Sequence, residues 1–259
     1  MAETRVALVT GAAQGIGEAI AMRLADDGLD IAVNDLPQKR DQLETVVEAI
    51  RAKGRRAYAV TGDVSDEDSV VAMIKTTVEE LGGLDVMVAN AGIAFFATIV
   101  DTPVEEWEKV MSINARSVML AVKHAARQMI EQGRGGRIIA ASSIAGKQGM
   151  PNVGVYAASK FAVRGLVQTA AVELRAHNIT VNGYCPGLIL TEMARSNLDE
   201  DDINGGPGAV AAKRVGGSPP GIKPAPPEVV ASYVSYIAKP ESYYITGQSV
   251  NVSGGWLMD

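Results

Sequence analysis

A tyrosine and a lysine spaced by one helical turn could transfer protons in this chain. If their segment is helical, Tyr156 and Lys160 lie on one face, because residues at i and i+4 are neighbours. A free phenol has a pKa of about 10 and is a poor acid or base at neutral pH. A nearby ammonium favours the phenolate, so Lys160 is expected to lower the pKa of Tyr156. Ser143 follows a strand-like apolar run and could bring a hydroxyl to the same place. Such a pair alone could also be a solvated helix face, so its interpretation depends on the rest of the chain.

A glycine-rich turn near the start of the chain predicts a dinucleotide site. The first predicted strand ends in TGAAQGIG, directly before a helical pattern. Gly11 permits a tight turn, Gly15 lets the backbone approach a pyrophosphate, and Gly17 lets the helix pack close to the strand. Free amides at the helix start favour phosphate charge. Gln14 and Ile16, within the same turn, are expected to line the site.

An aspartate at the end of the second predicted strand indicates which dinucleotide is bound. The Asp35 carboxylate can accept hydrogen bonds from both hydroxyls of an adenosine ribose and would repel a 2′-phosphate. Gln14 and Leu36 supply no positive charge for such a phosphate. The sequence therefore predicts NAD as the cofactor in preference to NADP.

Later strand ends carry further candidate residues to the same edge of the sheet. The end of the third strand would lie beside the adenine. A glycine after the fourth strand would let the backbone approach the cofactor, and a threonine after the sixth strand could reach the carboxamide. The expected cofactor contacts at these ends are Asp63, Val64, Asn90, Ala91, Gly92, Pro186, Gly187, Ile189 and Thr191.

Strand-like and helix-like segments alternate along the whole chain. The strands read as continuous apolar runs, which a parallel sheet covered on both faces requires. Repeated βα units with short loops predict one doubly wound, Rossmann-type α/β domain over 1–259, with a mostly or wholly parallel sheet of about seven strands. A long helical region over 103–132 is expected to contain a bend.

Composition excludes several classes of function. The chain has 259 residues, 47% of them hydrophobic, and a net charge of −6 with acidic and basic residues interleaved, so no nucleic-acid surface is expected. The single cysteine, Cys185, cannot form an intrachain disulfide and fits a reducing, cytoplasmic location. With one cysteine and two histidines, no metal site is expected. Neither a signal peptide nor a membrane span is expected.

The segment 192–226 interrupts the alternation with an acidic run and a Gly/Pro-rich tract. It could be a disordered surface insertion. Because it follows a strand end, where open α/β sheets bind ligands, a mobile lid over the site is the favoured interpretation.

Taken together, these motifs resemble the short-chain dehydrogenase/reductase family over essentially the whole chain. The resemblance implies that Tyr156 is the general acid in carbonyl reduction and the base in alcohol oxidation. Lys160 would lower the tyrosine pKa and bind the nicotinamide ribose. Ser143, rather than Ser142, would hold the substrate oxygen, and Asn114 would position a water in a proton relay. The family also commonly forms tetramers. The matching motifs are TGAAQGIG, Asp63, NAG (90–92), Asn114, Ser143, YAASK (156–160) and PGLILT (186–191).

The second half of the chain resembles acetoin/diacetyl reductases, also called 2,3-butanediol dehydrogenases, which use NAD. The shared segments are YAASKFAVRGLVQTAA, ITVNGYCPG and TGQSV. This chain has Ile144 and Met150 where bacterial members carry Gln and Asn, which predicts an apolar substrate pocket. The expected substrate contacts are Ser143, Ile144, Met150, Tyr156 and Gly187.

Three other functions stay open at this point. The first is a dehydrogenase of a bulkier apolar alcohol, terpenoid or steroid-like, which the apolar pocket residues favour. The second, a 3-oxoacyl-carrier-protein reductase, is disfavoured by Asp35 because those enzymes usually take NADPH. The third is a non-catalytic NAD-binding scaffold, which would not need the complete set of Asn114, Ser143, Tyr156 and Lys160.

Overall fold

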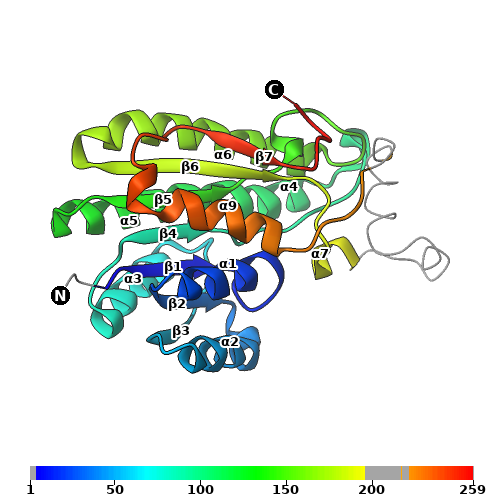
Figure 1. Cartoon of the computed structure of the whole chain (residues 1–259). Helices are drawn as coiled ribbons and strands as arrows, with labels where there is room; N and C mark the ends of the chain where they lie inside the picture. Colours follow the sequence, from blue (N-terminus) through cyan, green and yellow to red (C-terminus); the bar gives the residue numbers. More distant parts are fainter. Residues whose placement is uncertain (1–3, 196–216, 218–221, 259) are drawn as a thin grey trace.

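A seven-stranded sheet organises the computed structural model, which describes residues 4–195, 217 and 222–258. All neighbouring strands are parallel, in the order β3-β2-β1-β4-β5-β6-β7 (Figure 1). This confirms the predicted doubly wound α/β fold. The strands are β1 (Val6–Thr10), β2 (Asp30–Asp35), β3 (Ala57–Thr61), β4 (Val86–Ala89), β5 (Gly136–Ala141), β6 (Ile179–Pro186) and β7 (Ser249–Val252).

Helices cover both faces of this sheet. One buried cluster joins the sheet to α1, α2 and α9, and the other joins it to α3, α5 and α6. Figure 1 shows α1 and α9 on the near face. Alternate residues of β1 enter the two clusters, Ala7 the first and Leu8 the second, which explains the continuous apolar runs. The helices are α1 (Gly15–Asp26), α2 (Arg40–Ala52), α3 (Glu67–Leu81), α4 (Val104–Met111), α5 (Ser117–Gln132), α6 (Gly154–Leu174), α7 (Glu192–Arg195) and α9 (Glu228–Ala238).

The bend expected in the long helical region is a π-helical turn, Ser112–Arg116, between α4 and α5. Such a turn inserts an extra residue into a helix and often lies at a functional site. Asn114 sits inside it and is fully buried. The bend therefore sets the direction in which the Asn114 amide points.

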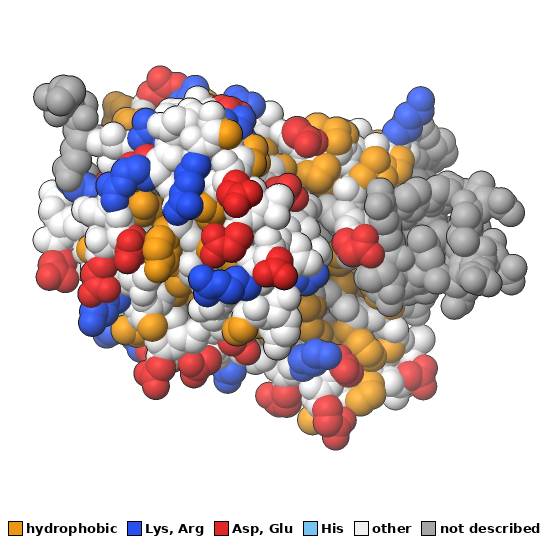
Figure 2. All heavy atoms as spheres, turned by 90° about the horizontal axis from the view of Figure 1, so that it is seen from below, with side chains coloured by type: hydrophobic (Ala, Val, Ile, Leu, Met, Phe, Trp, Pro, Cys, Tyr) orange, Lys and Arg blue, Asp and Glu red, His pale blue; other side chains and the backbone are white. Residues whose placement is uncertain are grey.

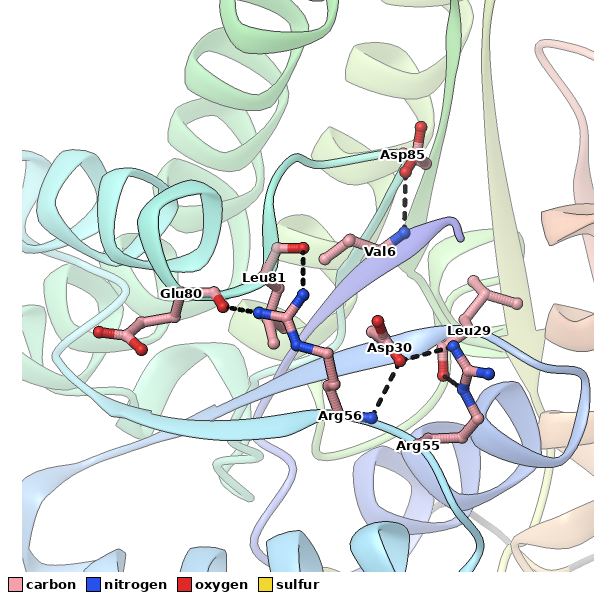
Figure 3. A network of polar contacts seen from close by, with 8 residues as sticks. All are labelled: Val6, Leu29, Asp30, Arg55, Arg56, Glu80, Leu81 and Asp85. Atoms are coloured by element: carbon pink, nitrogen blue, oxygen red, sulfur yellow. Dashed lines mark hydrogen bonds and ion pairs between the residues drawn. The ribbon is translucent and has the colours of Figure 1, made fainter. Parts of the chain in front are cut away.

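The amino-terminal edge of the sheet is held by paired polar groups (Figure 3). Asp30, at the start of β2, accepts hydrogen bonds from Arg55 Nη2 at 2.6 Å and from the Arg56 amide at 2.9 Å. Asp85, before β4, accepts from the Val6 amide at 2.8 Å and forms a two-point ion pair with Arg134. These carboxylates are buried and satisfied, so their role is to fix the strand starts.

Most of the segment expected to be a lid lies outside the described residues. Ala225, near its carboxyl end, pairs with residues that come just before the segment. The Leu190 amide donates to Ala225 O at 2.9 Å, and the Ala225 amide donates to Leu188 O at 3.0 Å. The chain on the two sides of the segment is therefore joined just after β6.

The described helices include none long and apolar enough to cross a membrane. On the face shown in Figure 2, acidic and basic side chains are interleaved, and no continuous basic patch covers it. No group of three or more His, Cys, Asp or Glu residues that could hold a metal occurs in the described ranges.

Candidate active site

One cavity of about 440 Å³ lies at the carboxyl edge of the sheet. The loops after six consecutive strands, β1 to β6, contribute to its wall. Of the predicted cofactor, substrate and catalytic residues, only Asn114 does not line it. The predicted residues that do are Gly11, Gln14, Gly15, Ile16, Gly17, Asp35, Leu36, Asp63, Val64, Asn90, Ala91, Gly92, Ser143, Ile144, Met150, Tyr156, Lys160, Pro186, Gly187, Ile189 and Thr191.

The glycine-rich turn after β1 leaves room for a phosphate group. Gly11 and Gly15 have φ angles of 63° and 62°, which L side chains rarely adopt. A Cβ on Gly17 would lie 2.1 Å from Gly11 O, so only glycine lets α1 start this close to the strand. No side chain caps α1 at Gln14, so its first amides stay available to an anion. A Cβ on Gly15 would lie 3.3 Å from Thr191 Cγ2, which places the loops after β1 and β6 face to face.

Asp35 is half-buried at one end of the cavity. Two backbone amides hold its carboxylate in place. Oδ2 accepts from Ala13 at 3.2 Å and Oδ1 from Leu36 at 2.9 Å. Lys39, which the sequence reasoning overlooked, hydrogen-bonds Gln14 Oε1 at 3.4 Å. A cation therefore does lie near this end of the cavity, because Gln14 lines it.

A partly buried polar network ties three strand ends together at the cavity wall. Asn90 Nδ2 donates to Thr10 O at 2.9 Å and to Gly11 O at 3.2 Å. The Tyr184 hydroxyl donates to Asn90 Oδ1 at 2.8 Å. Because all of these polar atoms are satisfied, the network fixes the position of the glycine-rich turn relative to β4 and β6.

The three polar residues expected to act on the substrate meet in this cavity. Tyr156 lies in the first turn of α6, and the nearby Ser143 hydroxyl acts to lower the pKa of its phenol. Lys160 Nζ lies 5.6 Å from the centroid of the Tyr156 ring and donates to Ala141 O at 2.9 Å. Ser142 points elsewhere, because its hydroxyl donates to Lys160 O at 3.0 Å. Both serines line the cavity, and the choice of Ser143 as the catalytic serine stays a prediction.

Burial controls the protonation of both groups on α6. Removal from water raises the pKa of Tyr156, and the nearby Ser143 hydroxyl only partly opposes this. Removal from water also lowers the pKa of Lys160 to about 8. Burial therefore holds the pKa of Tyr156 above its ordinary value, and the expected lowering of this pKa by Lys160 stays a prediction.

Asn114 reaches the site through the backbone after β4. Its Oδ1 accepts from the Ile93 amide at 2.8 Å, and its Nδ2 donates to Ile93 O at 2.8 Å and to Ser159 Oγ at 3.1 Å. A Cβ on Gly92 would lie 3.2 Å from Asn114 Oδ1 and 3.3 Å from Lys160 Nζ. Asn114 therefore sits directly behind the cavity wall, next to the lysine.

Apolar side chains surround the end of the cavity that holds Ser143 and Tyr156. Ile144 is buried and Met150 half-buried there, as the pattern predicted. Sequence reasoning missed the aromatic members of the wall; only the GGW sequence after the last strand could have drawn attention to one of them. Apolar lining residues include Ile93, Ala94, Phe96, Ile113, Ile144, Met150, Val153, Leu188, Met193 and Trp256.

Comparisons with known proteins agree with this geometry. The sequence profile of the short chain dehydrogenase family matches residues 5–202. A short-chain dehydrogenase/reductase of Armillaria gallica is 47% identical, with 100% of this chain and 98% of the relative covered. The L-2,3-butanediol dehydrogenase of Corynebacterium glutamicum is 42% identical, with 98% and 99% covered. The acetoin dehydrogenase structure from Salmonella typhimurium superposes with a TM-score of 0.85 at 33% identity, covering 98% and 96%. The chain therefore belongs to the short-chain dehydrogenase family and is an oxidoreductase.

Proposed function

We propose that this protein is an NAD(H)-dependent oxidoreductase that interconverts a secondary alcohol and a ketone. The observation that carries the proposal is one cavity with two chemically different ends. Ser143, Tyr156 and Lys160 line one end, and Asp35 lines the other. The uncapped start of α1 lies between them, where a pyrophosphate would bind.

In ketone reduction, the bound cofactor supplies the hydride that reaches the carbonyl carbon. Tyr156 donates its phenolic proton to the carbonyl oxygen as negative charge develops there. The Ser143 hydroxyl donates a hydrogen bond to the same oxygen and fixes its position. The raised pKa of Tyr156 keeps this proton on the phenol at neutral pH. In alcohol oxidation the steps reverse, and Tyr156 accepts the proton.

Lys160 and Asn114 support this proton transfer. The Lys160 ammonium stabilises the phenolate that forms when Tyr156 gives up its proton, and it binds the nicotinamide ribose hydroxyls. Asn114 holds a water that passes a proton between Lys160 and solvent. The closeness of Asn114 Oδ1 and Lys160 Nζ to Gly92 supports this role.

The cofactor in this proposal is NAD. Asp35 accepts hydrogen bonds from the adenosine ribose and repels a 2′-phosphate. Asp63 and Val64 flank the adenine, Thr191 contacts the carboxamide, and the loop after β6 completes the binding site. Lys39 is the group that would favour NADP, but its ammonium is hydrogen-bonded to Gln14.

Two substrate classes remain, each supported by a different observation. The activities of the butanediol and acetoin dehydrogenase relatives favour a small acetoin- or diacetyl-like substrate. The apolar wall containing Ile144 and Met150 favours a bulkier carbinol, terpenoid or steroid-like, with a single reacting oxygen.

The test is NADH or NADPH consumption by the purified protein with diacetyl and with trans-1-decalone in parallel. We expect turnover with NADH in preference to NADPH. Faster reduction of diacetyl would assign the small substrate, and faster reduction of decalone the bulky one. Tight NADH binding with no turnover on a wide carbonyl panel would contradict the proposal and indicate a non-catalytic scaffold.

The whole chain, 1–259, acts in this proposal as one domain of a cytoplasmic homo-oligomer, a tetramer by family resemblance. Exposed apolar side chains on the long helices support assembly: Trp107 on α4 is 42% exposed, and Phe161 and Val172 on α6 are 44% and 66% exposed. Light scattering during size-exclusion chromatography measures the oligomeric state. A monomeric mass would refute the proposed assembly.

A further inference from the structure

The segment after β7 folds back onto the cavity through a closed turn. Gly254 and Gly255 both have positive φ angles, 62° and 86°. The Trp256 amide donates to Ser253 O at 3.2 Å, and Asn251 Nδ2 donates to Leu257 O at 3.0 Å. These bonds fix the direction of the turn, so the position of Trp256 follows from the end of β7.

This turn rests on the catalytic side of the cavity. The Gly187 amide donates to Val252 O at 3.1 Å, and a Cβ on Gly187 would lie 2.9 Å from Ser253 Cα. A Cβ on Gly254 would lie 4.0 Å from Ile222 Cδ1, in the segment that returns toward α9. In Figure 1 the red segment after β7 lies beyond the arrowhead of that strand, on the carboxyl side of the sheet. The tail is thus in contact with the loop after β6 that closes the site.

Trp256 is the largest side chain of the cavity wall and comes from none of the six strand-end loops. It is half-buried and shares the wall with Phe96, Ile144, Met150 and Leu188. An indole offers about 150–250 Å² of rigid, mostly apolar surface. Methionine and isoleucine beside it add apolar contact but no partner for a second substrate oxygen.

We propose that Trp256 is a specificity-determining residue, whose indole packs against the hydrocarbon body of a carbocyclic ketone or secondary alcohol. The inference rests on the proposed function and deepens it, because it names the substrate class and the side chain that selects it. The small diketone, with little hydrocarbon to bury, gains little from this contact. Trp256 therefore affects binding of the bulky substrate more than that of the small one.

The chain allows a direct test, because it contains only two tryptophans. Trp107 lies on α4 and is absent from the cavity wall, so Trp107→Phe leaves Trp256 as the single indole. We expect NADH and then trans-1-decalone to change the emission of that variant in a saturable way. The matched variant Trp256→Phe, which retains Trp107, should show no decalone-dependent change. If the fluorescence emission of Trp256 did not change when trans-1-decalone was added, the inference would be overturned.

Kinetics supply the second readout. Trp256→Ala should raise KM for trans-1-decalone about 10- to 100-fold and change KM for diacetyl by less than about threefold. The KM of Trp256→Phe for trans-1-decalone should lie close to that of the parent, and Trp107→Phe should leave this KM unchanged. Equal losses for both ketones, or no loss for either, would overturn the inference. Absence of turnover in the unchanged protein would refute the proposed function instead, and the fluorescence titration would then decide the role of Trp256.

Discussion

The two ends of β2 each carry an aspartate, and their surroundings differ. Asp30 is 4% exposed and is paired with Arg55 and the Arg56 amide. Asp35 is half-buried, lines the cavity and, within the described residues, is held by backbone amides without an ion pair. The two aspartates therefore have different roles. Asp30, which is paired with an arginine, stabilises the fold, whereas Asp35, which has no ion pair among the described residues, can accept hydrogen bonds from a ligand.

The same contrast extends along both edges of the sheet. At the amino edge, Asp85 accepts from the Val6 amide (Figure 3). Its carboxylate also pairs with Arg134. At the carboxyl edge, Ser143 and Tyr156 both line the cavity. Buried polar groups need partners, so groups directed into a cavity are the ones left to meet a substrate.

Removing the paired aspartate should have the largest effect on stability. We expect Asp30→Ala to lower the free energy of unfolding by about 3 kcal/mol, because Arg55 loses its partner in a partly buried place. Chemical denaturation measures this value. The matched control Asp41→Ala, on the exposed face of α2, should change it by less than about 0.5 kcal/mol. If Asp30→Ala lowered the free energy of unfolding no more than Asp41→Ala does, the structural role assigned to Asp30 would be contradicted.

Removing the unpaired aspartate should change cofactor preference instead of stability. In Asp35→Ser, the ratio of kcat/KM for NADH to that for NADPH should fall about 10- to 100-fold, because two charge-assisted hydrogen bonds and the repulsion of a 2′-phosphate are lost. Lys39 beside Gln14 would then face the added phosphate. The variant should unfold within about 1 kcal/mol of the parent. An unchanged cofactor ratio would refute the role of Asp35.

The pH dependence should show the smallest effect, about tenfold per pH unit over a narrow window. Ketone reduction needs Tyr156 protonated and Lys160 charged. Tyr156 keeps its proton because its pKa is raised, whereas Lys160 loses its charge as pH rises through about 8. The reduction rate should therefore be level below about pH 8 and fall above it, measured as kcat against pH. A rate that rises from pH 8 to pH 10 would contradict this assignment.

The sheet and most of the cavity wall could be predicted from the sequence because they depend on local signals. Glycines at fixed spacing define the turn after β1, and the spacing of Tyr156 and Lys160 places both on one helix face. Continuous apolar strands predict a sheet covered on both sides. Each of these signals lies within a few residues of the structure that it determines.

The remaining features depend on packing between distant segments. The pKa of Tyr156 rises because of how deeply the fold buries it, which no local spacing reveals. Lys39 reaches Gln14 only because a short helical turn, Pro37–Lys39, redirects the chain after β2. Trp256 reaches the wall through a turn whose support comes from Gly187, far away in the sequence. The proposed lid falls mainly outside the described residues and stays a prediction.

The central claim, that the carboxyl edge performs proton transfer while the amino edge supports the fold, is tested most directly by Tyr156→Phe. This variant removes one hydroxyl and keeps the ring, and Tyr243→Phe, at a side chain 69% exposed, is its matched control. We predict that kcat for ketone reduction falls about 10²- to 10⁴-fold in Tyr156→Phe, with the Kd for NADH within about threefold of the parent. Retained turnover would contradict the account, and so would loss of NADH binding together with turnover, which would indicate a structural role for Tyr156.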